Sequence, residues 1–204
     1  MTTVKDKKLL YHLTDIDNLG SILSNGLLSR KKLIDSGEKF VDTANKEILE
    51  KREGEEFPLS EFVPFHFFSR NPYDYAIFNK QDIDNLVYIT IYRDKVQNEA
   101  FIVPEHPVSK NKPKIYPYKE GFNLIKWDII EADDRDYADP DTRRICMAEC
   151  IVRDSVPPEF FARLYVGSEP AEARVRALVD ASKFSDLKID LNSYMFKPPS
   201  DSQR

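Results

Sequence analysis

The sequence predicts an α+β fold in a single domain that spans residues 1–204. Short apolar runs with the character of strands, such as Val87–Tyr92 and Ile145–Val152, occur along the chain. Segments with helical spacing lie between them, including one that starts after the capping residue Ser168. A chain of 204 residues can bury a sizeable core without disulfide bonds or a metal ion.

The N-terminal region predicts a strand that leads into a helix. Leu9–Leu13 suits a short strand, and Thr14 or Asp15 would cap a helix that stops at Gly26. The apolar stripe of this helix would consist of Leu19, Ile22 and Leu23. His12 would then lie at a strand end that opens onto a helix N-terminus, where free N–H groups can receive an anion. A satisfied structural histidine is the alternative.

The middle of the chain predicts one helix and one aromatic strand. Ala44–Arg52 has helical spacing and would expose most of its charges to solvent. Phe62–Phe68 is typical of a strand, and Pro64 places it near a sheet edge or a bulge because proline cannot donate a ladder hydrogen bond. Most of these aromatic residues would form core. Those toward the end of the strand, with Tyr73 and Tyr75 after the following turn, could instead stack on a ring-shaped ligand.

Residues 104–121 predict a long irregular loop in which lysines alternate with tyrosines. Loops of this length are often functional, and this composition suits a nucleic-acid strand, although a solvated loop is the alternative. The candidate DNA-binding residues are Lys110, Lys112, Lys114 and Tyr116.

The C-terminal half predicts further strands and one clear helix. Phe122–Ile130 has the composition of a strand or a strand pair. The helix would run from Glu169 to about Ser182, with Pro170 in its first turn. The tail from Asn192 onward has no strong pattern and is expected to be loose.

Glu149 is the exception in the apolar run Ile145–Val152. If this run is a strand, Glu149 shares a face with Ile145, Met147 and Ile151. An ionised carboxylate in such surroundings is unfavourable unless it is paired or lines a cleft. A buried ion pair with Arg143 or Arg144 and a catalytic role are both open.

Composition and missing motifs exclude several classes of protein. The sequence has six glycines but no glycine-rich phosphate loop, which argues against a Rossmann dehydrogenase or a P-loop NTPase. We find no serine nucleophile motif and no zinc-binding pair, so no metal site is expected. The polar N-terminus, the absence of a membrane-spanning run and two unpaired cysteines fit a cytoplasmic protein. The net charge of −5 limits nucleic-acid binding to a local basic patch.

Four pieces of the sequence together resemble the DarT family of DNA ADP-ribosyltransferases, the toxins of bacterial toxin–antitoxin pairs. Each piece is weak alone, but their order is specific and covers roughly residues 8–167. They are Tyr11-His12-Leu13-Thr14 with Asn18-Leu19 and Gly26-Leu27; Arg52; Val63-Pro64-Phe65-His66-Phe67 with Asn71-Pro72; and Arg143-Arg144 with Met147-Ala148-Glu149.

The resemblance implies the ADP-ribosyltransferase fold, a split and strongly bent β-core with helices around an NAD cleft. It implies transfer of ADP-ribose from NAD, the co-substrate, onto a base in single-stranded DNA. Glu149 and Arg52 match the catalytic pair of the family, and His12, Thr14 and Asn18 match residues that hold NAD. An antitoxin that removes the modification is the implied partner, and we expect a monomer that does not bind membranes.

This sequence departs from many relatives in its aromatic segment. The segment reads Phe65-His66-Phe67-Phe68-Ser69-Arg70-Asn71-Pro72-Tyr73, where many relatives carry Tyr-Phe and a methionine after the proline. The segment from Ser29 to Ala44, with Met147-Ala148-Glu149, resembles the guanine-modifying branch more than the thymidine-modifying branch. We therefore favour guanine over thymidine. The alternatives are transfer to RNA or protein, or a module that binds NAD or nucleic acid without catalysis.

Overall fold

The computed structural model describes residues 2–42, 58–106 and 114–197 of the chain. Within these residues, eight strands form one mixed sheet with the order β10-β9-β4-β1-β3-β7-β5-β6. All neighbouring strands are antiparallel except β10 and β9. The strands are β1 (Leu9–Asp15), β3 (Phe62–His66), β4 (Leu86–Tyr92), β5 (Phe101–Val103), β6 (Tyr116–Pro117), β7 (Glu149–Arg153), β9 (Phe161–Val166) and β10 (Ile189–Leu191). A separate two-stranded ribbon joins β2 (Leu27–Leu28) and β8 (Ser155–Val156).

The sheet is split between β1 and β3. β1 pairs with β4 through seven residue pairs, and β3 pairs with β7 through five. β1 and β3 are joined only at Tyr11 and His66. The backbone carbonyl of Pro64 points across this split toward His12 of β1. The N–H that proline lacks would point to the same side, so its absence removes no hydrogen bond between β3 and β7. The prediction that Pro64 places its strand near an edge is therefore wrong, because β3 lies between β1 and β7, but the side of β3 toward β1 is almost unpaired.

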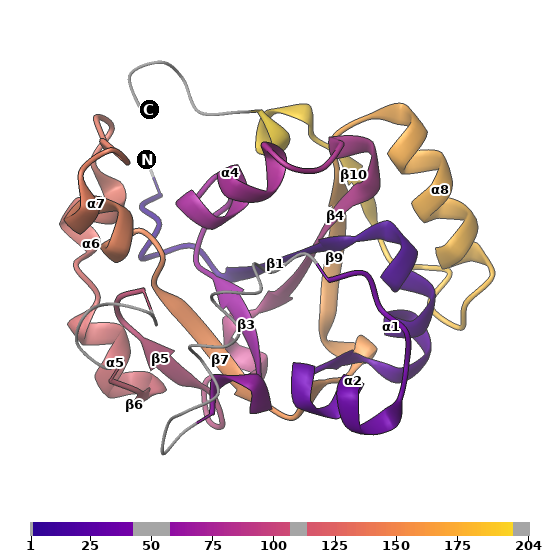
Figure 1. The fold of residues 1–204 in the computed structure, drawn as a ribbon, viewed down its shortest axis with the longest axis horizontal. Helices are drawn as coiled ribbons and strands as arrows, with labels where there is room; N and C mark the ends of the chain where they lie inside the picture. The colour runs from indigo at the N-terminus through magenta and orange to yellow at the C-terminus, as the bar shows by residue number, and fades with distance from the viewer. Residues whose placement is uncertain (1, 43–57, 107–113, 198–204) are drawn as a thin grey trace.

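Helices cover both faces of the half-sheet that contains β1, β4 and β9 (Figure 1). On one face, α1 (Leu19–Asn25) and α8 (Glu169–Asp180) contribute buried residues to the largest core cluster. On the other face, α4 (Pro72–Phe78) packs with a 3₁₀ turn, η6 (Ser193–Phe196). Successive β4 residues divide between the two cores because strand side chains alternate in direction. The remaining helices are α2 (Arg30–Ser36), α5 (Tyr118–Leu124), α6 (Trp127–Glu131) and α7 (Pro140–Ile145).

The predicted strand Ile145–Val152 is wrong in its first half. Ile145 ends helix α7, and β7 starts only at Glu149. Asp139 caps the start of the helix, and its carboxylate accepts hydrogen bonds from the backbone N–H groups of residues 141 and 142. Pro140 occupies the first helical position, where its missing N–H is harmless. These capping signals lie outside the apolar run, so the run alone gave the wrong boundary.

The predicted strand Phe122–Ile130 is also wrong, because it forms the end of α5 and most of α6. Tyr118 and Phe122 are four residues apart and stack at 5.6 Å between ring centroids, as neighbours on one helix face do. Phe122 also contacts Trp127, with ring centroids 4.8 Å apart. The irregular loop expected over residues 104–121 likewise contains β6 and the start of α5.

The C-terminal tail is more ordered than expected. β10 adds an edge strand parallel to β9, and η6 follows it. Met195 and Phe196 are buried, and the ring of Phe196 lies 5.1 Å from that of Tyr88 on β4. Burial of apolar side chains therefore fixes this segment. The predicted helix Ala44–Arg52 lies outside the described residues.

Gly121 tests how tightly α5 packs on β5, and Gly20 in α1 is the control. A Cβ at Gly121 would lie 2.5 Å from Cβ of Ile102, whereas one at Gly20 would lie 3.8 Å from Leu178. Gly121→Ala should lower the free energy of unfolding by about 1–3 kcal/mol through overpacking. Gly20→Ala, inside α1, should raise it by about 0.5–1 kcal/mol. Urea unfolding measures both, and equal effects of the two substitutions would contradict this packing.

Candidate active site

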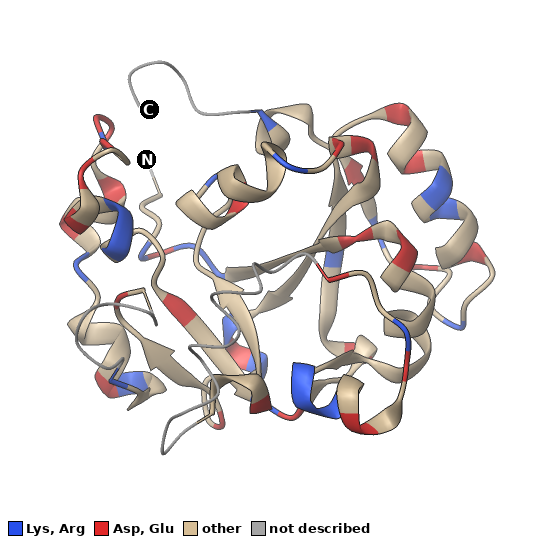
Figure 2. Cartoon of the chain, in the orientation of Figure 1, with Lys and Arg blue, Asp and Glu red and all other residues tan. Residues whose placement is uncertain are grey.

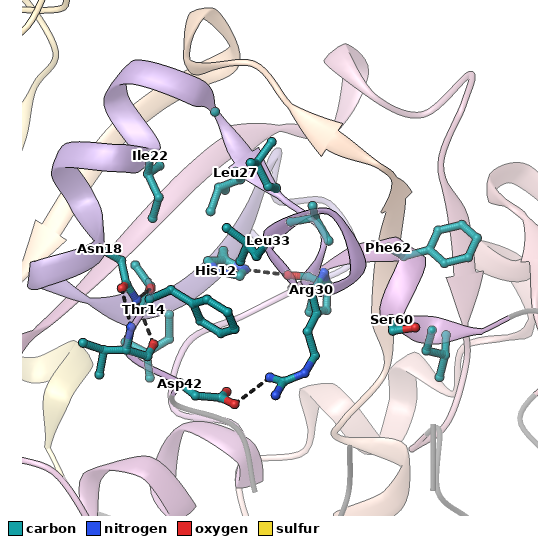
Figure 3. Close-up of a pocket in the computed structure, with 18 of the residues that line it drawn as sticks. His12, Thr14, Asn18, Ile22, Leu27, Arg30, Leu33, Asp42, Ser60 and Phe62 are labelled. Atoms are coloured by element: carbon teal, nitrogen blue, oxygen red, sulfur yellow. Dashed lines mark hydrogen bonds and ion pairs between the residues drawn. The ribbon is translucent and has the colours of Figure 1, made fainter. Parts of the chain in front are cut away.

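A cavity opens at the split between the two halves of the sheet (Figure 3). Its walls come from the end of β1, from α1 and α2, from residues 38–42, from β3 and from the start of α4. Polar side chains from both halves of the sheet face it. They include His12, Thr14 and Asn18 on one side, and His66, His106 and Glu149 on the other.

Glu149 lies at the start of β7, where it joins a row of side chains across the sheet. His66 pairs with Tyr11 on one side and with Glu149 on the other. Directly opposed residues in an antiparallel pair point to the same face with their Cβ atoms about 5 Å apart. Glu149 is only 5% exposed, yet it lines the cavity. Its side chain therefore faces a site with restricted access to water.

The arginines considered as partners of Glu149 have other surroundings. Arg144 forms ion pairs with Glu105 and Asp141, and Arg143 is exposed on α7. Of the residues expected on the face of Glu149, Ile151 follows it on the same strand, while Ile145 belongs to a helix. The carboxylate is thus placed by β7 itself and not by the longer strand expected from the sequence.

His12 is held at the split by the carbonyl of Pro64. Its Nδ1 lies 2.8 Å from this oxygen, and a carbonyl can only accept, so Nδ1–H is the donor. Burial lowers the pKa of His12, although the bond to Pro64 opposes this effect. The neutral ring therefore dominates at neutral pH, with Nε2 as an acceptor. Such a nitrogen suits a hydroxyl group, as on a ribose, and not a phosphate.

Asn18 fixes one wall of the cavity. Its side-chain amide donates to the hydroxyl of Thr14 at 3.2 Å and to the carbonyl of Val41 at 2.9 Å. Its side-chain oxygen accepts the backbone N–H of Val41 at 2.7 Å. Both donors of the amide are thus used within the protein. The structure brings Asn18 and Thr14 together in the cavity wall. The two bonds from Asn18 to the backbone of Val41 hold residues 38–42 against this wall.

Arg30 is a cavity residue that the sequence pattern did not reveal. It is the first residue of α2 after the cap Ser29, and its guanidinium pairs with Asp42 at 2.6 Å (Figure 3). The same guanidinium lies 5.6 Å from the ring centre of Phe40. The side chains of Arg30, Phe40 and Asp42 all line the cavity. A capping serine followed by arginine was the only local signal, and it did not indicate the distant partners.

His66 and Tyr73 form an aromatic pair beside Glu149. Their ring centroids are 5.6 Å apart with an angle of 33° between the planes, and both line the cavity. Tyr73 belongs to the first turn of α4, which starts with a capping box between Asn71 and Asp74. Asn71 and Asp74 are buried, so the helix start is firmly anchored. The sequence had suggested Tyr73 and Tyr75 as stacking residues. Tyr73 lies in the cavity wall, whereas Tyr75 is buried and does not line the cavity.

The other expected site residues lie away from the cavity or outside the described part of the chain. Arg52, Lys110 and Lys112 are among the residues not described. Lys114 is exposed, and Tyr116 is half-buried in β6 at the edge of the sheet. Neither contributes to the cavity wall.

The described residues contain neither a cluster suited to a metal ion nor a helix suited to a membrane. Over residues 2–42, 58–106 and 114–197, no group of three or more His, Cys, Asp or Glu side chains could hold a metal ion. In the same ranges, no helix is long and apolar enough to cross a membrane.

Comparison with known proteins identifies the family. Residues 11–197 match the model of the family described as "ssDNA thymidine ADP-ribosyltransferase, DarT". The chain belongs to the DarT family. A curated DarT-related protein of Thermosipho africanus, named as a DNA ADP-ribosyl transferase–DNA ADP-ribosyl glycohydrolase fusion, is 24% identical over 178 residues. That match covers 84% of this chain and 45% of the relative, so the chain spans about half the relative's length.

Solved DarT structures have the same fold. Thermus sp. 2.9 DarT in complex with ADP-ribosylated single-stranded DNA superposes with a TM-score of 0.80 at 22% identity, covering 93% of this chain and 96% of that one. Thermosipho africanus DarTG in complex with ADP-ribose gives 0.79 at 23% identity, covering 97% and 52%. The expected DarT resemblance and the expected α+β ADP-ribosyltransferase fold are therefore confirmed.

Asp74, which anchors the cavity wall, makes stability depend on pH. Burial raises its pKa to about 6, an effect that His66 opposes. An unfolded aspartate has a pKa of about 3.9, so between about pH 4 and 6 the folded state binds more protons. The free energy of unfolding should therefore lose roughly 2–3 kcal/mol from Asp74 as pH rises through this window. Urea unfolding should show this loss in the wild type and not in Asp74→Asn. Equal pH dependence of the two proteins would contradict it.

Proposed function

We propose that this protein transfers ADP-ribose from NAD to a base in single-stranded DNA. The observation that carries the proposal is the position of Glu149. It is a buried carboxylate at the wall of a cavity in the split sheet of a DarT fold. Relatives of the same fold were solved with NAD⁺, with carba-NAD⁺ and with ADP-ribosylated single-stranded DNA, which supports both proposed substrates.

The chemistry needs a carboxylate in a protected site. As the bond between nicotinamide and ribose breaks, its electron pair leaves with nicotinamide and positive charge develops on the sugar, as in glycoside hydrolysis. The Glu149 carboxylate would stabilise this charge, and the low exposure of the site strengthens that effect. A nitrogen of the base then forms the new bond to the sugar. Glu149 would orient the base or accept its proton.

The opposite wall of the cavity has groups that suit the rest of NAD. Neutral His12 offers Nε2 to a ribose hydroxyl, and Thr14 lies next to it on the same strand face. Arg30 is a fork-shaped donor suited to the pyrophosphate. Arg52 remains the proposed catalytic partner of Glu149 because it matches the family's arginine.

Guanine is the base that we propose, with thymidine as the alternative. The support is the likeness of residues 29–44 and of Met147-Ala148-Glu149 to the guanine-modifying branch. The matching family model is named for thymidine, so both bases belong in the first assay.

We also propose that the protein is a toxin with a partner that removes ADP-ribose from DNA. The relative from Thermosipho africanus is named as a fusion of a transferase with a glycohydrolase, which joins the two opposing activities in one chain. The second candidate function, transfer to RNA or protein, uses the same cavity and differs only in the acceptor. A binding module without catalysis would release no nicotinamide.

Glu149→Ala should abolish transfer without unfolding the protein. The loss should exceed about 100-fold because a preorganised group opposite the developing charge is removed. The assay is mass spectrometry of nucleosides from single-stranded DNA incubated with protein and NAD, with RNA and a protein as competing acceptors. Glu99→Gln, an exposed carboxylate outside the cavity, is the control. Near wild-type labelling by Glu149→Ala, or a large loss of its melting temperature, would refute the assignment.

Lysines 110, 112 and 114 should contribute to DNA binding without choosing the base. Changing Lys110, Lys112 and Lys114 to Ala should lower the rate at limiting DNA, since lysines neutralise phosphates. The slope of log affinity against log salt should shrink by about 0.7 for each lysine that neutralises a phosphate in the wild type. Titrations at several salt concentrations measure this slope, and the modified nucleoside should stay the same. An unchanged slope would place the DNA path elsewhere, and equal activity on duplex DNA would refute the preference for single strands.

A further inference from the structure

Two arginines lie on adjoining segments next to the cavity, and neither belongs to its wall. Arg70 is in the turn between β3 and α4, and Arg135 is in the segment between α6 and α7. The two segments are in contact, because the hydroxyl of Tyr137 donates to the carbonyl of Arg70 at 3.4 Å. The rings of Tyr75 and Tyr137 lie 5.7 Å apart across the same junction.

Both guanidinium groups have unused hydrogen-bonding capacity, although one Nη of Arg135 donates to the carbonyl of Ile130 at 2.8 Å. Among the described residues, the buried Nε of Arg70 and the buried Nε of Arg135 have no hydrogen-bond partner. No described carboxylate forms an ion pair with either arginine. Partly buried guanidinium groups without a counter-ion are unfavourable, and an anionic ligand would supply what is missing.

The positive charges of Arg70 and Arg135 both act on Tyr75. Burial raises the pKa of Tyr75, and the main opposing influences are the charges of Arg70 and then Arg135. The guanidinium of Arg70 lies 5.9 Å from the ring centre of Tyr75, and the charge of Arg135 acts on the same residue. Each is also braced by an aromatic ring, since Arg70 lies 4.4 Å from the ring centre of Tyr194 and Arg135 lies 5.1 Å from that of Phe68.

The backbone at Arg70 is strained in a way that glycine would relieve. Arg70 has a φ of 63°, which a non-glycine residue adopts at a penalty of about 1 kcal/mol or more. Strain of this kind persists where the surrounding structure needs the residue. The turn is four residues long from His66, so Arg70 lies within about 14 Å of the strand end beside Glu149.

We propose that Arg70 and Arg135 form a phosphate-binding site for the DNA strand, a few nucleotides from the modified base. This inference rests on the proposed function. Paired guanidinium groups bind phosphate oxygens with two parallel hydrogen bonds. Tyr194 is 63% exposed, and its ring offers a surface on which a neighbouring base can stack.

The charge around this site limits what else could bind there. Exposed aspartates 133, 134 and 136 flank Arg135, and acidic residues gather on the α6–α7 side of the molecule (Figure 2). They weaken long-range attraction for polyanions such as duplex DNA. The site therefore suits one phosphate in direct contact with the two arginines.

Arg70→Gly is the decisive variant because it removes the guanidinium and also relaxes the backbone. Fluorescence anisotropy should show single-stranded DNA bound about tenfold more weakly in the absence of NAD, the loss expected for one charge-assisted hydrogen bond. The salt slope should shrink by about 0.7. Arg176→Ala on α8, which removes an exposed arginine paired with Glu172, is the matched control and should bind DNA like the wild type.

Calorimetric titration with NAD separates the possible sources of the phosphate. Unchanged NAD affinity in Arg70→Gly supports the DNA site, whereas weakened NAD affinity with intact DNA binding would assign the arginines to NAD and overturn it. DNA binding by Arg70→Gly equal to that of Arg176→Ala overturns the site alone. A wild-type protein that neither binds nor modifies single-stranded DNA would overturn the proposed function as well.

Discussion

The structure depends on the near absence of pairing between β1 and β3. The two strands are joined only at Tyr11 and His66, while each is fully paired on its other side. Backbone groups along such a gap need other partners, because unpaired buried N–H and C=O groups are unfavourable. Pro64 removes one donor from the gap, and His12 satisfies its carbonyl. Both features reduce the number of unsatisfied backbone groups at the split and so stabilise it.

The split also explains how the cavity gathers residues that a continuous sheet would separate. His12 and Thr14 alternate with Tyr11 along β1, so they point to the face opposite to that of Tyr11. Tyr11, His66 and Glu149 form a row on the second face. In an unbroken sheet, His12 and Thr14 would lie on the opposite side of the backbone from Glu149. Opening the sheet at this point gives both sets access to one cavity.

Local signals predicted the parts of the fold that depend on local interactions. The strand at Leu9–Leu13 and the helix capped by Ser168 were correct because alternation and capping act within a few residues. The boundary at Glu149 failed because the cap at Asp139 lay outside the apolar run. Glu149 and His12 could be found as polar residues in apolar surroundings. Arg30 and its neighbours Phe40 and Asp42 could not, because the clamp of Asn18 on Val41 brings them to the cavity.

The net negative charge of the protein is compatible with the two proposed anionic substrates only if individual cationic side chains lie where each substrate binds. The net charge is −5, so no general field attracts NAD or DNA. At the cavity, Arg30 is held by Asp42, and exchange of that carboxylate for a phosphate would keep the guanidinium paired throughout binding. Arg70 before α4 and Arg135 between α6 and α7 have no such carboxylate among the described residues. A phosphate binding there would pair with the guanidinium groups without displacing another anion, so the proposed site would contribute more to DNA affinity than its exposed surface suggests.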